Sequence, residues 1–255
     1  MERLRISKVL EMAPSSNKIT ICGWVRTFRN DRFLAVNDGS TIHNIQLVVQ
    51  REDLKESVLK QLNTGAAIRA VGVLVESQGG GQSVEIQVEE LEILGGADPD
   101  EFPIQMKKHS LEFLREKAHL RFRTNTFSAI FRIRHLLQFA VHKFFHDQGF
   151  YQLHTPIITG SDAEGAGEMF KVTTLDLESL PKLEDGGTDF SQDFFGKPSN
   201  LTVSGQLEAE LAAMALGQVY TFGPTFRAEN SNTSRHLAEF WMIEPEIAFA
   251  DLKDD

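Results

Sequence analysis

The sequence has one cysteine, no long apolar segment and no surplus of basic residues. Cys22 has no partner for an internal disulfide, so a disulfide-stapled scaffold is excluded and a reducing, cytoplasmic location is expected. No run of about 18 apolar residues occurs, and the start MERLRISKVL lacks the long apolar segment of a secretory signal, so we expect no membrane association. With 255 residues, 41% of them hydrophobic, the chain is long enough for two globular domains.

The net charge of -10 argues against a uniformly basic nucleic-acid-binding protein, but the charges are unevenly placed. Nine basic residues face two acidic ones between 102 and 145, whereas nine acidic residues face two basic ones between 162 and 196. Salt confines the field of a charge to roughly 8 Å, so a local basic zone can bind phosphates on an acidic protein. A solvated helix surface explains the same pattern equally well.

Five short apolar segments separated by turn signals fill the first part of the chain. They are ITICGWVRTFR, RFLAVNDGS, NIQLVVQ, AAIRAVGVLVE and SVEIQVEELEIL, all between residues 19 and 94. Their spacing and the GGG turn at 79–81 predict a small closed sheet, with a helix over 52–62. A five-stranded barrel with one helix is typical of oligonucleotide-binding barrels, although another small barrel fits the same pattern. We place this domain at residues 1–98.

The stretch GGADPDEFP reads as a linker, so we expect a boundary near residue 100. We assign 99–125 to a linker or hinge and 126–255 to a second domain. That domain is expected to open with a helix capped by Thr126 and stopped by Gly149. The helical spacing is carried by Phe127, Ile130, Phe131, Leu137, Val141, Phe144 and Phe145.

The segment LTVSGQLEAELAAMALGQ predicts a strand, then Ser204 as N-cap, then a helix that ends at Gly217. Gln206 and Glu210 lie four positions apart on it and therefore share one face. The other elements expected here are a strand in the stretch 150–159 that leads into Pro156, strands over 218–229 and 237–249, and loops over 161–168, 181–200 and 230–236.

The stretch FRAENSNTSRH places an arginine and a glutamate on one face of an apolar strand. Alternation puts Arg227 and Glu229 on that face and predicts a core role for the opposite face, which carries Tyr220, Phe222 and Phe226. An antiparallel return strand would bring Phe240 beside the pair. An arginine, a carboxylate and an aromatic ring suit a nucleotide, and a salt-bridged sheet surface is the alternative.

Longer motifs carry a resemblance to a known family. TFRAENSNTSRHLAEFWMIEPEIAF resembles the second signature of class II aminoacyl-tRNA synthetases, and GFYQLHTPIIT resembles the first, whose helix and strand form the dimer interface in that family. Following a barrel like an anticodon-binding domain, this is the order of the aspartyl, asparaginyl and lysyl subgroup. The resemblance implies an α+β protein, in which a five-stranded oligonucleotide-binding β-barrel precedes the first part of an antiparallel-sheet catalytic domain.

Within the subgroup, the motifs SDAEGAGEMF and LTVSGQL are most similar to asparaginyl enzymes. Aspartyl enzymes carry a lysine at the position of Ala209, and a buried cation suits an acidic substrate. Glu210 can accept hydrogen bonds from an asparagine side-chain NH2. An aspartyl enzyme, a non-catalytic tRNA-binding paralogue and a stand-alone amidating ligase remain alternatives.

The resemblance also implies roles for single residues. Arg227 would hold the α-phosphate of ATP, Glu229 the adenine amino group and Phe240 the adenine ring, with Arg235 or His236 at the outer phosphates. Glu164 and Gln206 would fix the ammonium and backbone of the amino acid. In the barrel, Arg29, Phe33 and Gln46 match anticodon-contacting positions; for Phe33 a core role is the alternative.

The implied reaction is attachment of asparagine to tRNA(Asn) through an adenylate, with ATP and Mg²⁺. Glu244 or Glu246 could add a carboxylate to the metal, although the metal ligands stay unassigned. A homodimer is expected from the first signature. The glycine-rich third signature of the family is absent from the 255 residues. We therefore expect an N-terminal fragment that does not complete adenylation alone.

Overall fold

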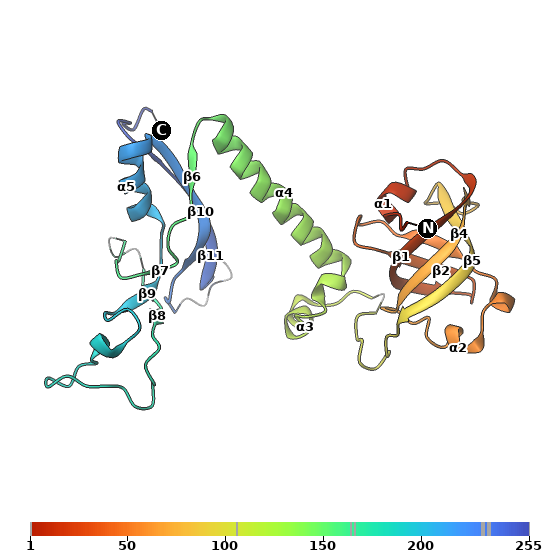
Figure 1. The fold of residues 1–255 in the computed structure, drawn as a ribbon, viewed down its shortest axis with the longest axis horizontal. Helices are drawn as coiled ribbons and strands as arrows, with labels where there is room; N and C mark the ends of the chain where they lie inside the picture. The colour runs from red at the N-terminus through yellow and green to blue at the C-terminus, as the bar shows by residue number, and fades with distance from the viewer. Residues whose placement is uncertain are drawn as a thin grey trace. The chain divides into compact units, whose positions relative to one another are not determined.

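The chain folds into two compact units, Met1–His135 and Leu136–Asp255 (Figure 1). The structure is a computed structural model that describes residues 2–105, 107–163, 165, 167–230, 233 and 236–254. Within these ranges no helix combines the length and the apolar character needed to cross a membrane. The division into a barrel, a linker and a second domain at residues 98 and 125 stays a prediction.

The first unit is built on the predicted closed barrel. Its strands are β1 (Ser15–Arg29), β2 (Phe33–Asn37), β3 (Ile45–Val48), β4 (Ala67–Glu76) and β5 (Val84–Gly95), closed in the order β1-β2-β3-β5-β4. Alternate residues such as Leu34, Val36, Ile45 and Leu47 are fully buried, and helix α1 (Ile6–Val9) adds Ile6 and Val9 to the same core. Closure leaves no free sheet edge, so the outward side chains are presented on a rigid surface.

The prediction of one continuous helix over 52–62 is wrong in extent. Two short pieces replace it, η1 (Arg51–Asp53) and α2 (Glu56–Leu59), because Leu54 adopts an extended conformation between them. Leu54, Val58 and Leu59 all pack against the barrel core. Burying these three side chains fixes the local backbone more strongly than helix propensity does.

Between the barrel and the long helix lie α3 (Leu111–Glu116) and η2 (Arg121–Arg123). The long helix, α4, spans Asn125–Asp147, and the predicted cap Thr126 is wrong by two positions. Thr124 takes that role, since its Oγ1 accepts a hydrogen bond from the N–H of Phe127 at 3.3 Å. After α4, Gly149 has a φ of 85°, which confirms it as the stop signal.

The second unit contains two three-stranded sheets. In one, β10 (Gln218–Phe226) pairs antiparallel with β11 (Glu239–Ile247) and parallel with β6 (Tyr151–Leu153). In the other, β9 (Ser199–Leu201) lies between β7 (Ile158–Thr159) and β8 (Lys171–Val172), and η3 (Phe190–Gln192) precedes β9 in the chain. Helix α5 (Gln206–Leu216) ends at Gly217 as predicted. Gly205 is its N-cap in place of Ser204, whose Oγ accepts from the N–H of Gln206 at 3.0 Å.

The expectation that one face of β10 is core and the other free is wrong in part. Thr221 and Thr225, which share the face of Arg227, are 3% and 2% exposed. On the opposite face Tyr220 is buried, yet Trp241, which lies opposite Pro224 and contacts the Phe222 ring, is 42% exposed. The reason is α5, whose small residues pack against this sheet around Val219, so the Arg227 face is open only at its far end.

The carboxylate of Asp193 ties the long excursion between β8 and β9 to the residues that follow β8. Asp193 accepts hydrogen bonds from the hydroxyl of Thr173 at 2.6 Å, and from the N–H and hydroxyl of Thr174 at 2.9 and 2.8 Å. The Thr173 hydrogen bond, followed by that from the Thr174 N–H, holds the pKa of this carboxyl well below its ordinary value. The segment is therefore tied to β8 by an ionised side chain.

We predict that this tie weakens in acid. Because the pKa of Asp193 is depressed on folding, its contribution is complete at neutral pH and declines as the pH falls below about 4. Hydrogen exchange of residues 173–198 should be faster in Asp193→Asn than in wild type at pH 7, and the difference should shrink at low pH. Glu184→Gln, an exposed acid of the same segment, serves as control. A difference that is constant with pH would contradict the prediction.

Candidate functional site

A cavity of about 370 Å³ lies where β10 and β11 end their pairing. The register places Thr225 opposite Phe240, and the N–H of Arg227 donates to the carbonyl of Ala238 at 3.0 Å, which extends the ladder. The cavity is lined by Arg227, Glu229, Asn230, His236, Leu237, Ala238 and Phe240. The structure thus brings together four of the predicted nucleotide-binding side chains. Arg235 and Glu164 lie outside the described residues.

Arg227 carries unused hydrogen-bonding capacity. Its guanidinium carbon lies 5.4 Å from the centroid of the Phe240 ring, a cation–π contact. Its Nε is buried and has no hydrogen-bond partner among the described residues. Within the same ranges no ion pair joins Arg227 to Glu229, so the simple salt-bridge explanation fails. An unpaired buried donor is costly, and an anionic ligand would satisfy it.

The loop that precedes β8 brings its backbone close to Arg227 and Glu229. The carbonyl of Glu168 accepts from the N–H of Ala228 at 2.7 Å. A Cβ built on Gly167 would stand 2.7 Å from Glu229 Oε1 and 3.2 Å from Arg227 Cδ. A methyl group there would force the Glu229 carboxylate and the Arg227 side chain to shift, so glycine suits this close approach, a contact that the sequence analysis missed. The sequence feature that could have indicated this contact is the glycine-rich loop at 161–168, where glycines alternate with acidic residues.

The predicted amino-acid pocket is only partly recognisable. Gln206 Nε2 donates to Glu210 Oε1 at 2.9 Å on α5, so these two side chains meet as the helical spacing predicted. Neither of them lines the Arg227 cavity. Ala209 is fully buried in the contact between α5 and the sheet. Its small size therefore has a packing reason, which weakens the inference from Ala209 to a neutral substrate.

Glu244 joins the start of α5 to the sheet. It lies opposite Thr221, and its carboxylate accepts from the Thr221 hydroxyl at 2.8 Å, from the Gly205 N–H at 3.2 Å and from the Ser204 hydroxyl. These bonds argue against Glu244 as an open metal ligand. Across the described part of the chain, no cluster of three or more His, Cys, Asp or Glu could hold a metal ion.

The predicted anticodon-contacting residues share the outer face of the barrel. Arg29 of β1 lies opposite Phe33 of β2, and the next outward residue of β2, Ala35, lies opposite Gln46 of β3. Phe33 is half-buried and lies outside the barrel core, so its alternative role as a core residue is wrong. The Arg32 guanidinium carbon lies 5.5 Å from the Phe33 ring centroid. A ring, a guanidinium and an amide therefore follow one surface.

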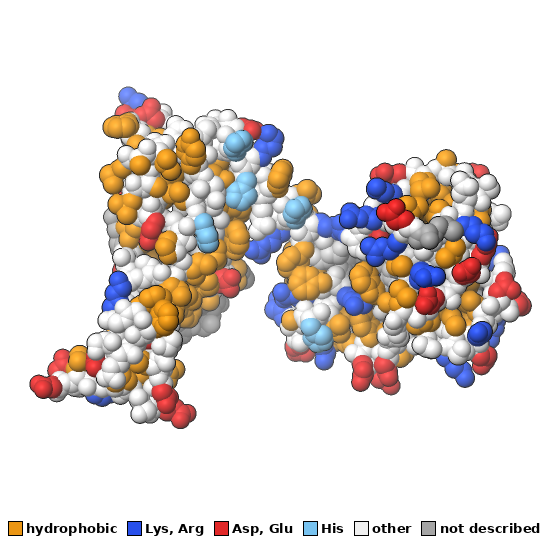
Figure 2. Space-filling view, in the orientation of Figure 1, with side chains coloured by type: hydrophobic (Ala, Val, Ile, Leu, Met, Phe, Trp, Pro, Cys, Tyr) orange, Lys and Arg blue, Asp and Glu red, His pale blue; other side chains and the backbone are white. Residues whose placement is uncertain are grey.

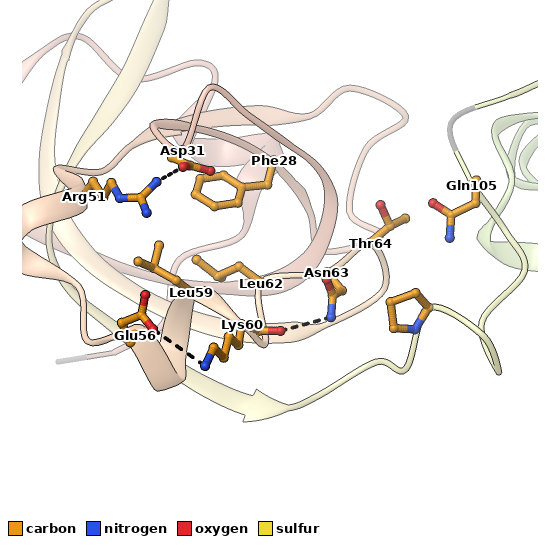
Figure 3. Close-up of a pocket in the computed structure, with 11 residues that line it drawn as sticks. Phe28, Asp31, Arg51, Glu56, Leu59, Lys60, Leu62, Asn63, Thr64 and Gln105 are labelled. Carbon is orange, nitrogen blue, oxygen red and sulfur yellow. Dashed lines mark hydrogen bonds and ion pairs between the residues drawn. The ribbon is translucent and has the colours of Figure 1, made fainter.

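A larger cavity of about 460 Å³ lies in the first unit beside α2 (Figure 3). None of the predicted site residues lines it. Its charged side chains neutralise each other, because Arg51 pairs with Asp31 and Lys60 with Glu56, as Figure 3 shows. Surface pairs of this kind leave little net charge to attract a ligand.

The basic zone between 102 and 145 is used partly for structure. Arg121 lies over the ring of Phe127 and Arg123 over that of Trp24, at 4.9 and 5.2 Å from their centroids. Figure 2 shows basic and acidic side chains intermixed over the visible face of the first unit. Both arginines thus have aromatic partners within the unit, although Arg121 Nε, like Arg227 Nε, is buried without a hydrogen-bond partner among the described residues.

Comparison with known proteins matches both units to families. Residues 110–254 match the family described as tRNA synthetases class II (D, K and N), and residues 19–94 match the OB-fold nucleic acid binding domain. The synthetase match covers more than half of the chain. The barrel match agrees with the strand order of the first unit.

Individual relatives point the same way. Asparagine–tRNA ligases of Cytophaga hutchinsonii and Parabacteroides distasonis are each 60% identical to the whole chain, which covers 56% and 55% of them. An asparaginyl-tRNA synthetase from Pyrococcus horikoshii, complexed with asparaginyl-adenylate, has a TM-score of 0.80 at 28% identity over 100% of this chain and 55% of its own. The chain spans about half the length of these relatives. From these matches and the fold, the chain belongs to the class II tRNA synthetase family of the D, K and N type.

Proposed function

We propose that this sequence carries the nucleotide-binding and anticodon-binding parts of an asparagine–tRNA ligase. The reaction joins the carboxylate of asparagine to the α-phosphorus of ATP, releases pyrophosphate, and transfers the asparaginyl group to tRNA(Asn). The observation that carries the proposal is the grouping of Arg227, Glu229 and Phe240 in one cavity, with a buried guanidinium N–H that lacks a partner. The cytoplasm is the proposed location.

In this proposal the protein acts on ATP by positioning and by charge. Arg227 binds the α-phosphate and stabilises the negative charge that develops there, Glu229 accepts from the adenine amino group, and Phe240 supports the ring. His236, and Arg235 outside the described residues, are the candidates for the outer phosphates. Mg²⁺ would arrive with the phosphates and neutralise their charge; the described residues offer no dedicated cage for it.

Asparagine would bind near the start of α5. Gln206 is the candidate partner of its backbone, Glu164 of its ammonium, and Glu210 of its side-chain NH2. Support for the pocket comes from Glu244, which holds Gly205 and so the start of α5 in place. The 60% identity to asparagine–tRNA ligases supports asparagine over aspartate more directly than Ala209 does.

The barrel would bind the tRNA anticodon. Single-stranded bases stack on exposed aromatic rings and are read along their edges. Phe33 offers a ring on the outer face, Arg29 a cation beside it, and Gln46 an amide that can read a base edge.

A second copy of the chain is the proposed partner of α4. This helix has no fully buried residue, and Leu136 and Phe139 are 64% and 67% exposed. Exposed apolar side chains along several turns of one helix are typical of a protein interface. A symmetric dimer would cover them.

The proposed reaction predicts the effect of Arg227→Ala. ATP–pyrophosphate exchange by the protein carrying this sequence at its natural length should depend on asparagine and not on aspartate. Removing one preorganised cation at the developing charge should lower kcat by about 100-fold or more. Arg69→Ala, which changes an exposed barrel arginine, is the control. Exchange that is supported by aspartate alone would disprove the proposed substrate.

Gly167 supplies a second prediction. In Gly167→Ala the new methyl group would displace the Glu229 carboxylate and crowd Arg227, so the KM for ATP should rise by about tenfold or more while the KM for asparagine changes little. Gly80→Ala, in the barrel, is the control, because a Cβ there meets nothing within 4 Å. Equal effects of the two substitutions would show that Gly167 has no role in the ATP site.

The proposed dimer gives a third prediction, which concerns the oligomeric state of variants in α4. The double variant Leu136→Glu, Phe139→Glu should be monomeric in sedimentation equilibrium at concentrations where wild type is dimeric, since two buried carboxylates would oppose association. Thr126→Glu adds a charge to the first turn of the same helix and should leave the dimer intact. A wild-type protein that stays monomeric at high concentration would contradict the interface.

A further inference from the structure

The buried residue Thr202 lies where three segments of the second unit meet. It directly follows β9, is 6% exposed, and donates its N–H to the carbonyl of Ile157 at 2.8 Å, next to β7. Its own carbonyl accepts from the N–H of Phe226 at 2.9 Å, at the end of β10. Its hydroxyl contacts Ser204, just before α5. Thr202 therefore joins both sheets to the start of the helix.

The Thr202 hydroxyl fixes the backbone of Ser204 on both sides. It donates to the Ser204 carbonyl at 2.5 Å and accepts from the Ser204 N–H at 3.3 Å. Ser204 is itself 7% exposed, and its Oγ accepts from the Gln206 N–H at 3.0 Å and donates to Glu244. The position of Gln206, the candidate partner of the asparagine backbone, thus depends on a hydroxyl four residues earlier.

The Thr202 carbonyl reaches the nucleotide site by a second route. Phe226, which donates to this carbonyl, directly precedes Arg227, and the Arg227 N–H in turn donates to Ala238. Arg227 is the candidate partner of the α-phosphate. One buried residue therefore holds both the backbone before Gln206 and the backbone before Arg227.

The proposed reaction depends on the spacing between these two positions. The asparagine carboxylate must approach the α-phosphorus to about 3–3.5 Å, and a misplacement of about 1 Å can lower the rate by about 100-fold. Each substrate can still bind in its own pocket when the spacing is wrong. A residue that controls the spacing therefore affects a ligand that spans both pockets more than it affects either substrate alone.

We propose that Thr202 is a positioning residue that sets the spacing between the asparagine and ATP sites, through its hydroxyl on one side and its carbonyl on the other. This inference rests on the proposed function, because the two sites are those assigned to Gln206 and Arg227. Thr202 acts through Ser204 and Phe226 and touches neither substrate itself.

The test compares separate ligands with a joined ligand, in the protein carrying this sequence at its natural length. Asparagine, ATP and a non-hydrolysable asparaginyl-adenylate analogue are titrated into wild type and Thr202→Val by calorimetry. In the variant, both backbone groups of Ser204 lose their hydroxyl partner at nearly unchanged side-chain volume. The affinity loss for the analogue should exceed the product of the losses for asparagine and ATP by about tenfold or more. A loss no larger than that product overturns the proposal.

Two further substitutions separate the hydroxyl from folding and packing. Thr202→Ser keeps the hydroxyl and should bind the analogue nearly as well as wild type; a loss as large as that of Thr202→Val overturns the proposal. Thr20→Val makes the same change at a barrel threonine that is 6% exposed, and should leave all three affinities unchanged. If Thr202→Val does not fold, Thr202→Cys offers a weaker donor and acceptor and should show the same excess loss for the analogue. The absence of that excess in a folded Thr202→Cys also overturns the proposal.

Kinetics give a second readout. In ATP–pyrophosphate exchange, Thr202→Val should lower kcat by about tenfold or more, while the KM for ATP stays within about twofold of wild type. A purely structural role would reduce the fraction of active protein and leave the analogue with no excess loss of affinity, which contradicts the spacing role. Wild type that binds neither asparagine nor the analogue would instead remove the proposed function, and the spacing role with it.

Discussion

The antiparallel register of β10 and β11 is the constraint on which the nucleotide site depends. It sets Thr225 opposite Phe240, and one more backbone bond, from the Arg227 N–H to the Ala238 carbonyl, extends the pairing one residue past each strand. A shift by one residue would send Arg227 and Phe240 to opposite faces. Every role assigned to these side chains follows from that pairing.

Neighbouring elements then confine the chemistry to one end of the sheet. Helix α5 covers the beginning of the Arg227 face through its alanines, and Glu244 holds its first turn against β10. The Gly167 backbone closes on the Arg227 and Glu229 side chains from the loop. The result is a cavity lined by the ends of β10 and β11 and by the residues that follow and precede them.

The barrel uses a comparable device on its outer face. Alternation places Phe33 and Gln46 outward, and the Gln46 amide donates to the buried carboxylate of Glu85 at 2.9 Å. In both units a charged group is fixed by neighbours on other elements before any ligand arrives. Such preorganisation reduces the entropy that binding must otherwise overcome.

Local patterns in the sequence predicted much of this arrangement. The barrel strands, the helix ending at Gly217 and the side-by-side placement of Arg227 and Phe240 follow from alternation, glycine signals and family motifs. Contacts between distant segments did not follow, since nothing near Gly167 or Glu85 indicates that they touch Glu229 or Gln46. Tertiary packing also overrode local preference at Leu54, and at the face of β10 that α5 covers.

The central claim is that the β10–β11 end cradles an adenylate. The most direct measurement is a crystal structure of the protein with a non-hydrolysable asparaginyl-adenylate analogue. The account predicts adenine against Phe240, its amino group at Glu229 and the phosphate mimic at Arg227. Adenine bound elsewhere, with Arg227 left unpartnered, would contradict it.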